Sequence, residues 1–316
     1  MTFKSIFARR LADYIGLRQK LGYKMQSQFG ALRMFDRYLC RRRHRGRLTQ
    51  AVAVEFATSN PAVTRMECWR RYLFVRQFAE YLAIFDPKTP KLDPRALPRT
   101  SGRPPIALIF EGGLATLLEK SRSISPRHPI RGVTLHAMIG LAASTGLRIG
   151  EIVRLDDQDV QLDAGMGVLA IRATKFKKDR MVPVHPSTVA VLRAYRIARD
   201  AAILKRDCPA FFRSLWGRRY TAHTLEGAFC RLGREIGLRK ATGPGPNFHC
   251  LRHRFAVQRL VSWYKKGVDV QTKLPALATY MGHVNYTSTA YYLTGTAELM
   301  RLAATRYHRA SIKERE

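Results

Sequence analysis

The sequence predicts a mainly α-helical fold that carries a small antiparallel β-sheet in the second of two domains. Three observations lead to this prediction. Apolar residues recur at helical spacing through the first hundred positions, prolines crowd the segment 86–105, and two apolar stretches at 167–172 and 181–184 flank a charged turn, as in a β-hairpin. With 316 residues, 46% of them hydrophobic, the chain is long and apolar enough for two domains that each bury a core.

Residues 1–97 are expected to form a helical domain. A third helix is predicted around 51–57, ended by the Ser-Asn-Pro breaker at 59–61, and a fourth over 63–84. Four short amphipathic helices can bury their apolar faces in one small bundle. The first two helices follow from apolar positions near helical spacing: Leu11, Tyr14 and Ile15 in one, and Leu32, Phe35, Tyr38 and Leu39 in the other.

Prolines interrupt helices, and we interpret 98–105 as a linker to a second domain over 106–295. Residues 296–316 are expected to form a helical tail with a narrow apolar stripe, which either packs on its own domain or docks in trans on a neighbouring subunit. Besides the hairpin, the second domain is predicted to hold helices at about 108–121, 133–145 and 149–155, followed by further helices near its end.

The chain is strongly basic, with 56 Lys and Arg against 23 Asp and Glu and a formal net charge of +33. The electrostatic field of so large a charge attracts polyanions, of which DNA and RNA backbones are the commonest. The charge run at 41–47 can be a solvated surface loop, but beside a helical bundle in so basic a protein, phosphate contact is favoured. The residues predicted to contact phosphates here and near the linker are Arg41, Arg42, Arg43, Arg45, Arg47, Arg99 and Arg103.

The five cysteines are scattered without a Cys-x-x-Cys pair, which argues against a disulfide framework or a zinc site and is typical of a reducing cytoplasm. No apolar run approaches the ~20 residues needed to span a bilayer, and no signal-peptide pattern opens the sequence. We therefore expect a cytoplasmic, nucleoid-associated protein without a membrane partner. P-loop, GxGxxG, HExxH and GxSxG motifs are absent, so ATP-driven and dinucleotide chemistry are not expected.

Several cationic and hydrogen-bonding residues of the second domain are candidates for a phosphate-binding catalytic site when their order along the chain is considered. Each of them alone has a structural explanation, such as a surface arginine or a core histidine. The order is Arg148 after a sharp turn, Lys175 at the hairpin turn, His249 and Arg252 one helical turn apart, His283 after a glycine, and Tyr292 nine residues later.

This order and spacing resembles the tyrosine recombinase (phage integrase) family over about residues 106–295. The resemblance implies a two-domain, C-shaped DNA clamp. Two departures from the family pattern are Thr174 where a glycine is usual and Met281 where leucine is common, and Lys177 and Lys178 are close competitors of Lys175 for the position of the hairpin lysine. The implied site residues are Arg148 and Arg252 as the arginine pair, His249 and His283 as the two histidines, Lys175 as the hairpin lysine, Tyr292 as nucleophile and Glu151 as support for the first arginine.

The chemistry of these residues agrees with the resemblance. Two guanidiniums can bind the oxygens of a phosphate undergoing displacement, a task that metal ions perform in other enzymes, so neither metal nor cofactor is expected. A tyrosine that forms a 3′-phosphotyrosyl bond conserves the energy of the broken phosphodiester, so no ATP is needed. His249 is expected to act as base and Lys175 as acid, with His283 bonding the phosphate. Spacing favours Tyr292 over Tyr291 as nucleophile.

The sequence thus predicts a site-specific recombinase or integrase that serves a mobile element or chromosome-dimer resolution. It is expected to act as a homotetramer on two double-stranded DNA sites, with or without accessory or sister recombinases. A type IB topoisomerase or telomere resolvase would use the same tyrosine chemistry with a different outcome. A non-catalytic DNA-binding accessory factor with a recombinase fold is the alternative outside enzymes, although a pure binder has no chemical need for Tyr292.

Overall fold

Contacts in the computed structural model divide the chain into two compact units, Met1–Arg103 and Pro104–Glu316. Of the segment 98–105, which the sequence predicts to be a linker, the structure describes only Pro98. The residues that the structure describes are 3–98, 108–125, 127–163, 166–172, 179–203, 207–241, 245–283, 287–294, 299–301 and 304.

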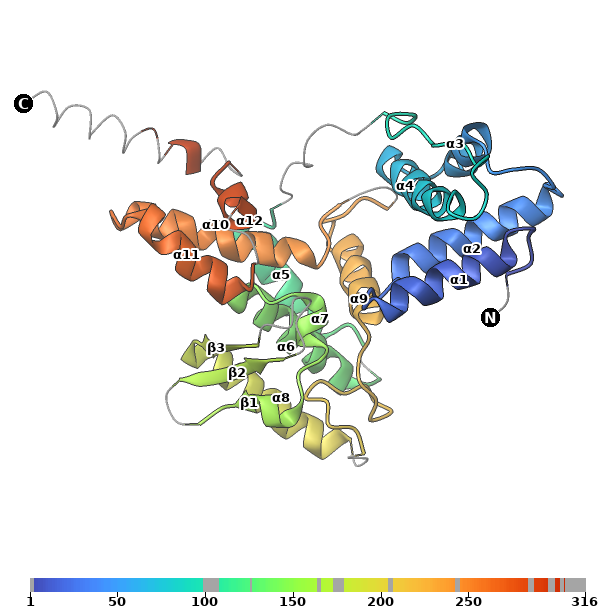
Figure 1. Cartoon of the computed structure of the whole chain (residues 1–316). Helices are drawn as coiled ribbons and strands as arrows, with labels where there is room; N and C mark the ends of the chain where they lie inside the picture. The colour runs from blue at the N-terminus through green and yellow to red at the C-terminus, as the bar shows by residue number, and fades with distance from the viewer. Residues whose placement is uncertain are drawn as a thin grey trace, which may run out of the picture. The chain divides into compact units, whose positions relative to one another are not determined.

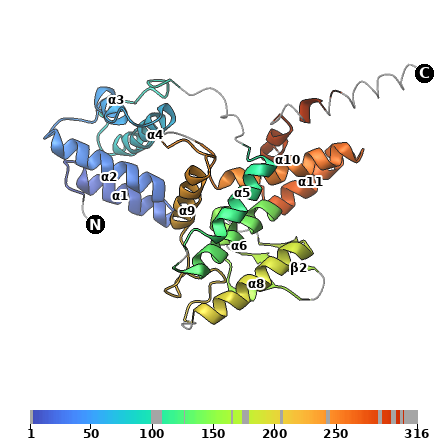
Figure 2. The same cartoon turned by 180° about the vertical axis from the view of Figure 1, so that it is seen from behind.

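The first unit is helical, and α1 and α2 lie side by side in it (Figures 1 and 2). Thr49 and Thr64 cap two of its helices, because their side chains accept hydrogen bonds from the backbone amides of Val52 and Glu67. Its core is rich in aromatic rings, such as Phe35 and Phe56, whose centroids are 5.0 Å apart. The helices are α1 (Ala8–Lys20), α2 (Gln26–Arg41), α3 (Gln50–Thr58) and α4 (Arg65–Leu82).

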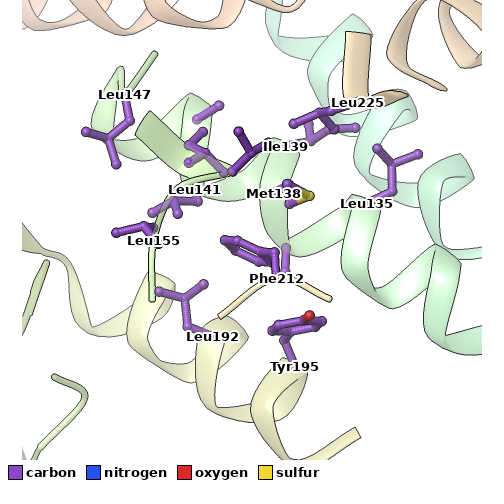
Figure 3. Close-up of a cluster of buried hydrophobic side chains, with 14 of the residues drawn as sticks. Leu135, Met138, Ile139, Leu141, Leu147, Leu155, Leu192, Tyr195, Phe212 and Leu225 are labelled. Carbon is purple, nitrogen blue, oxygen red and sulfur yellow. The ribbon is translucent and has the colours of Figure 1, made fainter. Parts of the chain in front are cut away.

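The second unit begins with α5 (Glu111–Arg122) and α6 (Pro129–Thr145), which pack against each other. The predicted helix at 133–145 starts earlier, at Pro129, because proline suits the first turn of a helix, where its missing N–H is not needed. Apolar side chains of α6 meet α8 (Pro186–Ala202) and α9 (Ala222–Glu235) in the main core, where the labelled rings are Tyr195 and Phe212 (Figure 3).

The expected hairpin is present within a three-stranded antiparallel sheet of order β1-β2-β3. Strands β2 (Gly167–Ile171) and β3 (Arg180–Val184) form the hairpin, and β1 (Val160–Gln161) pairs with the other side of β2. Pro183 lies in β3, where the missing N–H is tolerated because β3 is an edge strand. The predicted mainly helical fold with a small antiparallel sheet is confirmed.

The chain then forms a second apolar cluster from α10 (His249–Lys265) and α11 (Val270–Met281), which lie side by side (Figures 1 and 2). The short helices α12 (Thr287–Ala290) and η2 (Tyr291–Thr294) follow, and Tyr292 is part of this cluster. Earlier in the unit, α7 covers only Ile149–Ile152 of the predicted 149–155, and the 3-10 turn η1 covers Asp157–Asp159. Among the described residues, no helix is long and apolar enough to cross a membrane.

Candidate active site

Arg148 lies at the start of α7, directly after the sharp turn that ends α6. Gly146 makes this turn with φ +66°, and a Cβ there would lie 2.6 Å from Cδ1 of Phe255, so both the backbone angle and the space require glycine. Glu151 then holds Arg148 at two points: Oε2 accepts from the backbone amide at 3.0 Å and Oε1 accepts from Nη1 at 3.0 Å. Glu151 therefore fixes both the backbone and the guanidinium of Arg148.

Arg252 is the most enclosed charged group of the site, with 1% of its surface exposed. It projects from α10, and its guanidinium donates to the carbonyl of Gly146 at 2.7 Å and to that of Met281 at 2.8 Å. Burial, followed by the charge of Arg148, lowers the pKa of Arg252 to about 10, so the group stays charged at neutral pH. The α6–α7 turn, α10 and the end of α11 thus meet at this side chain.

Arg180, at the start of β3, is a third arginine of the site that the sequence pattern did not identify. Its Nη1 and Nη2 donate to Oε1 and Oε2 of Glu151 at 3.2 and 3.0 Å, and its Nε donates to the carbonyl of Tyr280 at 2.9 Å. Burial alone would raise the pKa of Glu151, but the hydrogen bonds and charges of Arg180 and Arg148 lower it. Glu151 is therefore an ionised carboxylate between two guanidiniums.

The three arginines together bind the last carbonyl groups of α11. Arg180 donates to the carbonyl of Tyr280, and Arg252 donates to that of Met281. Nη2 of Arg148 donates to the carbonyl of Gly282 at 3.0 Å. Carbonyls at a helix end have no partner within the helix and carry partial negative charge, so guanidiniums are suitable donors to them. This contact positions the segment that leads to His283.

Gly282 ends α11 in the left-handed region, with φ +67°. A Cβ at this position would lie 2.6 Å from Nη1 of Arg180, so a side chain would displace the arginine. His283 follows, and its Nδ1 lies 2.7 Å from Oγ1 of Thr289 in α12. Its ring stacks on that of Tyr292 with centroids 6.2 Å apart. The structure thus brings His283 and Tyr292 together.

The phenol of Tyr292 is also close to a histidine that the sequence pattern did not assign. Nδ1 of His253, on α10, lies 3.2 Å from the Tyr292 hydroxyl. His249 lies one turn earlier on α10, and its ring meets that of His253 edge-on with centroids 4.7 Å apart. Only 3% of the Tyr292 surface is exposed, whereas His249 is exposed at the helix start.

Desolvation and the nearby positive charges disfavour a protonated imidazole in this site. Desolvation of the ring, then the charges of Arg252 and Arg148, lower the pKa of His283 to about 3. The His249 side chain reaches solvent, yet the atoms packed around its ring, then His253, Arg252 and Arg148, lower its pKa to about 4. Both imidazoles are neutral at pH 7, and the arginine cluster has the charge to bind an anion such as phosphate.

Some predicted site residues fall outside the described part of the chain: Lys175, and Arg99 and Arg103 near the linker. The side chain of Tyr291 is likewise outside it. Among the described residues, no group of three or more His, Cys, Asp or Glu side chains could hold a metal ion.

The basic run at 41–47 continues from the end of α2 in the first unit, and its arginines are exposed. Arg42 pairs with Glu55 and donates to the Tyr38 hydroxyl at 2.9 Å, and Nε of Arg47 lies 3.4 Å from Oδ2 of Asp86. Arg43 adopts a left-handed backbone with φ +50°. Two of the five arginines in this run, Arg42 and Arg47, therefore pair with carboxylates in the free protein.

Residues 116–298 match the model of the phage integrase family. The chain is 43% identical over 304 residues to a protein of Sinorhizobium fredii named "Putative integrase/recombinase y4rE", and the match covers 96% of both chains. It is also 30% identical over 155 residues to the tyrosine recombinase XerC of Chlamydia caviae, a match that covers 49% of this chain and 45% of that one.

Solved structures show the same fold. The XerH site-specific recombinase, in a post-cleavage complex with palindromic difH substrate, matches with a TM-score of 0.65 and 18% identity over 90% of this chain and 80% of that one. The Tn1549 transposon integrase bound to circular intermediate DNA matches with a TM-score of 0.65 and 19% identity over 95% and 98%. The family model covers more than half of the chain and a relative matches nearly all of it, so this chain belongs to the phage integrase family of tyrosine recombinases.

Proposed function

We propose that this chain is a site-specific DNA recombinase that cleaves and rejoins duplex DNA through a 3′-phosphotyrosyl intermediate on Tyr292. The observation that carries the proposal is the position of Tyr292: its phenol lies among His253 and His283, next to the arginine cluster of the same unit. Catalysis would need neither metal nor ATP. The family relationship supports the reaction class, and the chemistry of the site supports the roles below.

Arg148 and Arg252 bind the scissile phosphate in this proposal. Negative charge gathers on the nonbridging oxygens as the phosphorus is attacked, and fixed guanidinium donors stabilise it without having to reorganise. Arg252 is held in place by two carbonyls and Arg148 by Glu151, so both have a defined direction before DNA arrives. His283, neutral at pH 7, adds a hydrogen bond to the phosphate or fixes its geometry.

Tyr292 attacks the phosphorus, and the bond to the 5′ oxygen breaks. An imidazole of the site, for which the family pattern implies His249, accepts the phenolic proton, and Lys175 protonates the departing 5′ oxygen. The phosphotyrosyl bond keeps the free energy of the phosphodiester because phenolate is also a good leaving group. A 5′ hydroxyl from a second strand can then reverse the step and complete the exchange.

The substrate in this proposal is a pair of duplex sites held by four copies of the chain, which exchange strands in turn. The strong positive charge of +33 supports binding to the DNA backbone. The exposed arginines at 41–47, with Arg99 and Arg103, are proposed as phosphate contacts. The relative XerH is named for a complex with its DNA substrate, and the Tn1549 integrase for one with transposon circular intermediate DNA.

Covalent capture tests this function directly. The protein would be incubated with fragmented host DNA in EDTA and denatured in SDS, and the attached fragments sequenced, with Tyr292→Phe and Tyr291→Phe in parallel. Adducts at a common site that disappear only in Tyr292→Phe are expected. Adducts that survive Tyr292→Phe would refute the nucleophile. DNA binding without any adduct would favour a non-catalytic accessory factor, and relaxation of supercoiled DNA without a site would favour a topoisomerase.

A further inference from the structure

His253 lies within hydrogen-bonding distance of the Tyr292 hydroxyl. Its Nδ1 lies 3.2 Å from the phenolic oxygen, and the two rings meet edge-to-face with centroids 5.4 Å apart. His249, which the family pattern implies as base, contacts the ring of His253, one turn further along the same helix. The geometry therefore places a different imidazole next to the reacting oxygen.

We propose that His253 is a catalytic residue whose Nδ1 accepts the phenolic proton of Tyr292 as the phenol attacks DNA, an inference that rests on the proposed function. The Tyr292 Oη–P bond forms while the P–O5′ bond breaks. The phenolic proton moves to Nδ1 of His253, and the 5′ oxygen takes a proton from the general acid, the role given to Lys175. On rejoining, the imidazolium returns its proton to Oη as the 5′ hydroxyl attacks.

This role requires a neutral His253 with its proton on Nε2. Burial, followed by the charge of Arg252, lowers its pKa, which keeps the ring neutral at pH 7. The titratable and charged groups around it are Arg252 and His249 on α10 and Tyr292 on η2, with His283 stacked on the phenol. A bound phosphate would add negative charge beside the arginines and raise the proton affinity of these imidazoles, so the base becomes stronger when substrate is present.

Because Tyr292 is buried, its contact with His253 has a second possible role, which is to hold the tyrosine in place. With 3% of its surface exposed, the tyrosine must be uncovered before a phosphate reaches it. His253 could in that case merely hold the tyrosine in the DNA-free protein. The two uses differ in direction: removing a proton acceptor slows adduct formation, whereas removing a holding contact accelerates it or leaves it unchanged.

The test is the pH profile of adduct formation in a single turnover by wild type, His253→Gln and His249→Gln. The substrate is a nicked duplex of the sequence recovered by covalent capture. Glutamine can keep a hydrogen bond but cannot take a proton. We expect His253→Gln to react at least ~10²-fold more slowly at pH 7. Its rate should rise steadily toward the phenol pKa near ~10, while the wild-type rate levels off above the imidazole pKa.

We expect His249→Gln to slow the reaction but keep the plateau. A plateau that is lost in His249→Gln and kept in His253→Gln would overturn the proposal, as would a His253→Gln protein at least as fast as wild type. Wild type that forms no adduct would refute the proposed function itself, which is a separate outcome.

A second measurement needs no DNA. In protein labelled with ¹⁵N-histidine, the imidazole resonance that disappears in His253→Gln belongs to His253. We expect it to show the Nε2–H tautomer and to shift in Tyr292→Phe but not in Tyr291→Phe. A proton on Nδ1, or a resonance unchanged by Tyr292→Phe, would contradict the hydrogen bond on which the proposal depends.

Discussion

Glu151 and Arg180 form a two-point ion pair between α7 and β3, in which Nη1 and Nη2 of the arginine donate to the two carboxylate oxygens at 3.2 and 3.0 Å. Glu151 also holds Arg148, so one buried carboxylate orients two guanidiniums. Substitutions at Glu151 or at its partners should therefore affect the stability and activity of the second unit more than their size suggests.

Replacing Glu151 by glutamine should destabilise the protein by about 3 kcal/mol, because two guanidiniums in an enclosed site would lose their negative partner. Urea unfolding followed by circular dichroism measures this change. Glu119→Gln is the matched control, since Glu119 is an exposed carboxylate on α5. Equal unfolding midpoints for the two variants would mean that the Glu151 pairs contribute nothing.

Replacing Gly282 by alanine should cost more than the same change at Gly267. Both glycines have a left-handed backbone, with φ +67° and +69°, so both variants carry the backbone penalty of about 1 kcal/mol. Only at Gly282 would the new Cβ meet Arg180, whereas nothing lies within 4 Å of it at Gly267. Thermal unfolding should show an additional loss of about 1–3 kcal/mol for Gly282→Ala.

Arg252→Lys should reduce covalent adduct formation by about 10²–10³-fold, because a lysine cannot replace the two directed donors of the guanidinium. DNA affinity, measured by electrophoretic mobility shift, should change much less. Arg259→Lys is the control, because Arg259 is exposed on the same helix with its guanidinium over the ring of Phe255. A normal adduct yield from Arg252→Lys would exclude Arg252 from phosphate binding.

The stability of the folded protein should fall as the pH drops from about 6.5 toward 4. The pKa of His283 is lowered to about 3 in the folded protein, so between these pH values the unfolded chain binds protons that the folded one does not. A fully shifted imidazole gives a slope of about 1.4 kcal/mol per pH unit, and partial exposure of this ring reduces it. Urea unfolding of His283→Asn should show a shallower slope, and that of His223→Asn, at an exposed histidine of α9, the wild-type slope.

Two exposed arginines of the basic run should contribute one phosphate contact each to DNA binding. We expect Arg43→Gln and Arg45→Gln each to reduce the slope of log affinity against log salt by about 1. Arg42→Gln should change the slope less, because Glu55 already pairs with Arg42. Fluorescence anisotropy over a range of salt concentrations measures these affinities. Slopes equal to that of wild type would exclude a DNA contact at positions 43 and 45.

Local patterns were sufficient to predict the helical fold class and the hairpin, because both depend on residues near each other in the sequence. The strand β1 was missed, since two residues, Val160 and Gln161, are too few to show alternation. Pro129 was outside the predicted helix because the apolar pattern alone does not mark a first turn.

In the site, too, contacts between residues close in the sequence could be predicted, whereas contacts between distant residues could not. Arg148 and Glu151 stand three residues apart, so their relationship is visible in the sequence. Arg180 and His253 were not identified, because their partners Glu151 and Tyr292 lie 29 and 39 residues away. Nothing in the local pattern distinguishes such residues from an ordinary hairpin charge or a core histidine.

The binding of the three arginines to the end of α11 has a consequence for how this protein can vary. The acceptors are main-chain carbonyls of Tyr280, Met281 and Gly282, and every amino acid supplies the same carbonyl. Mutations at position 281 can therefore exchange one apolar side chain for another without removing an acceptor, as the methionine in place of the family's common leucine illustrates. Evolution is free to adjust the packing of this helix while the arginines keep their anchor, whereas glycine at 282 has no such freedom.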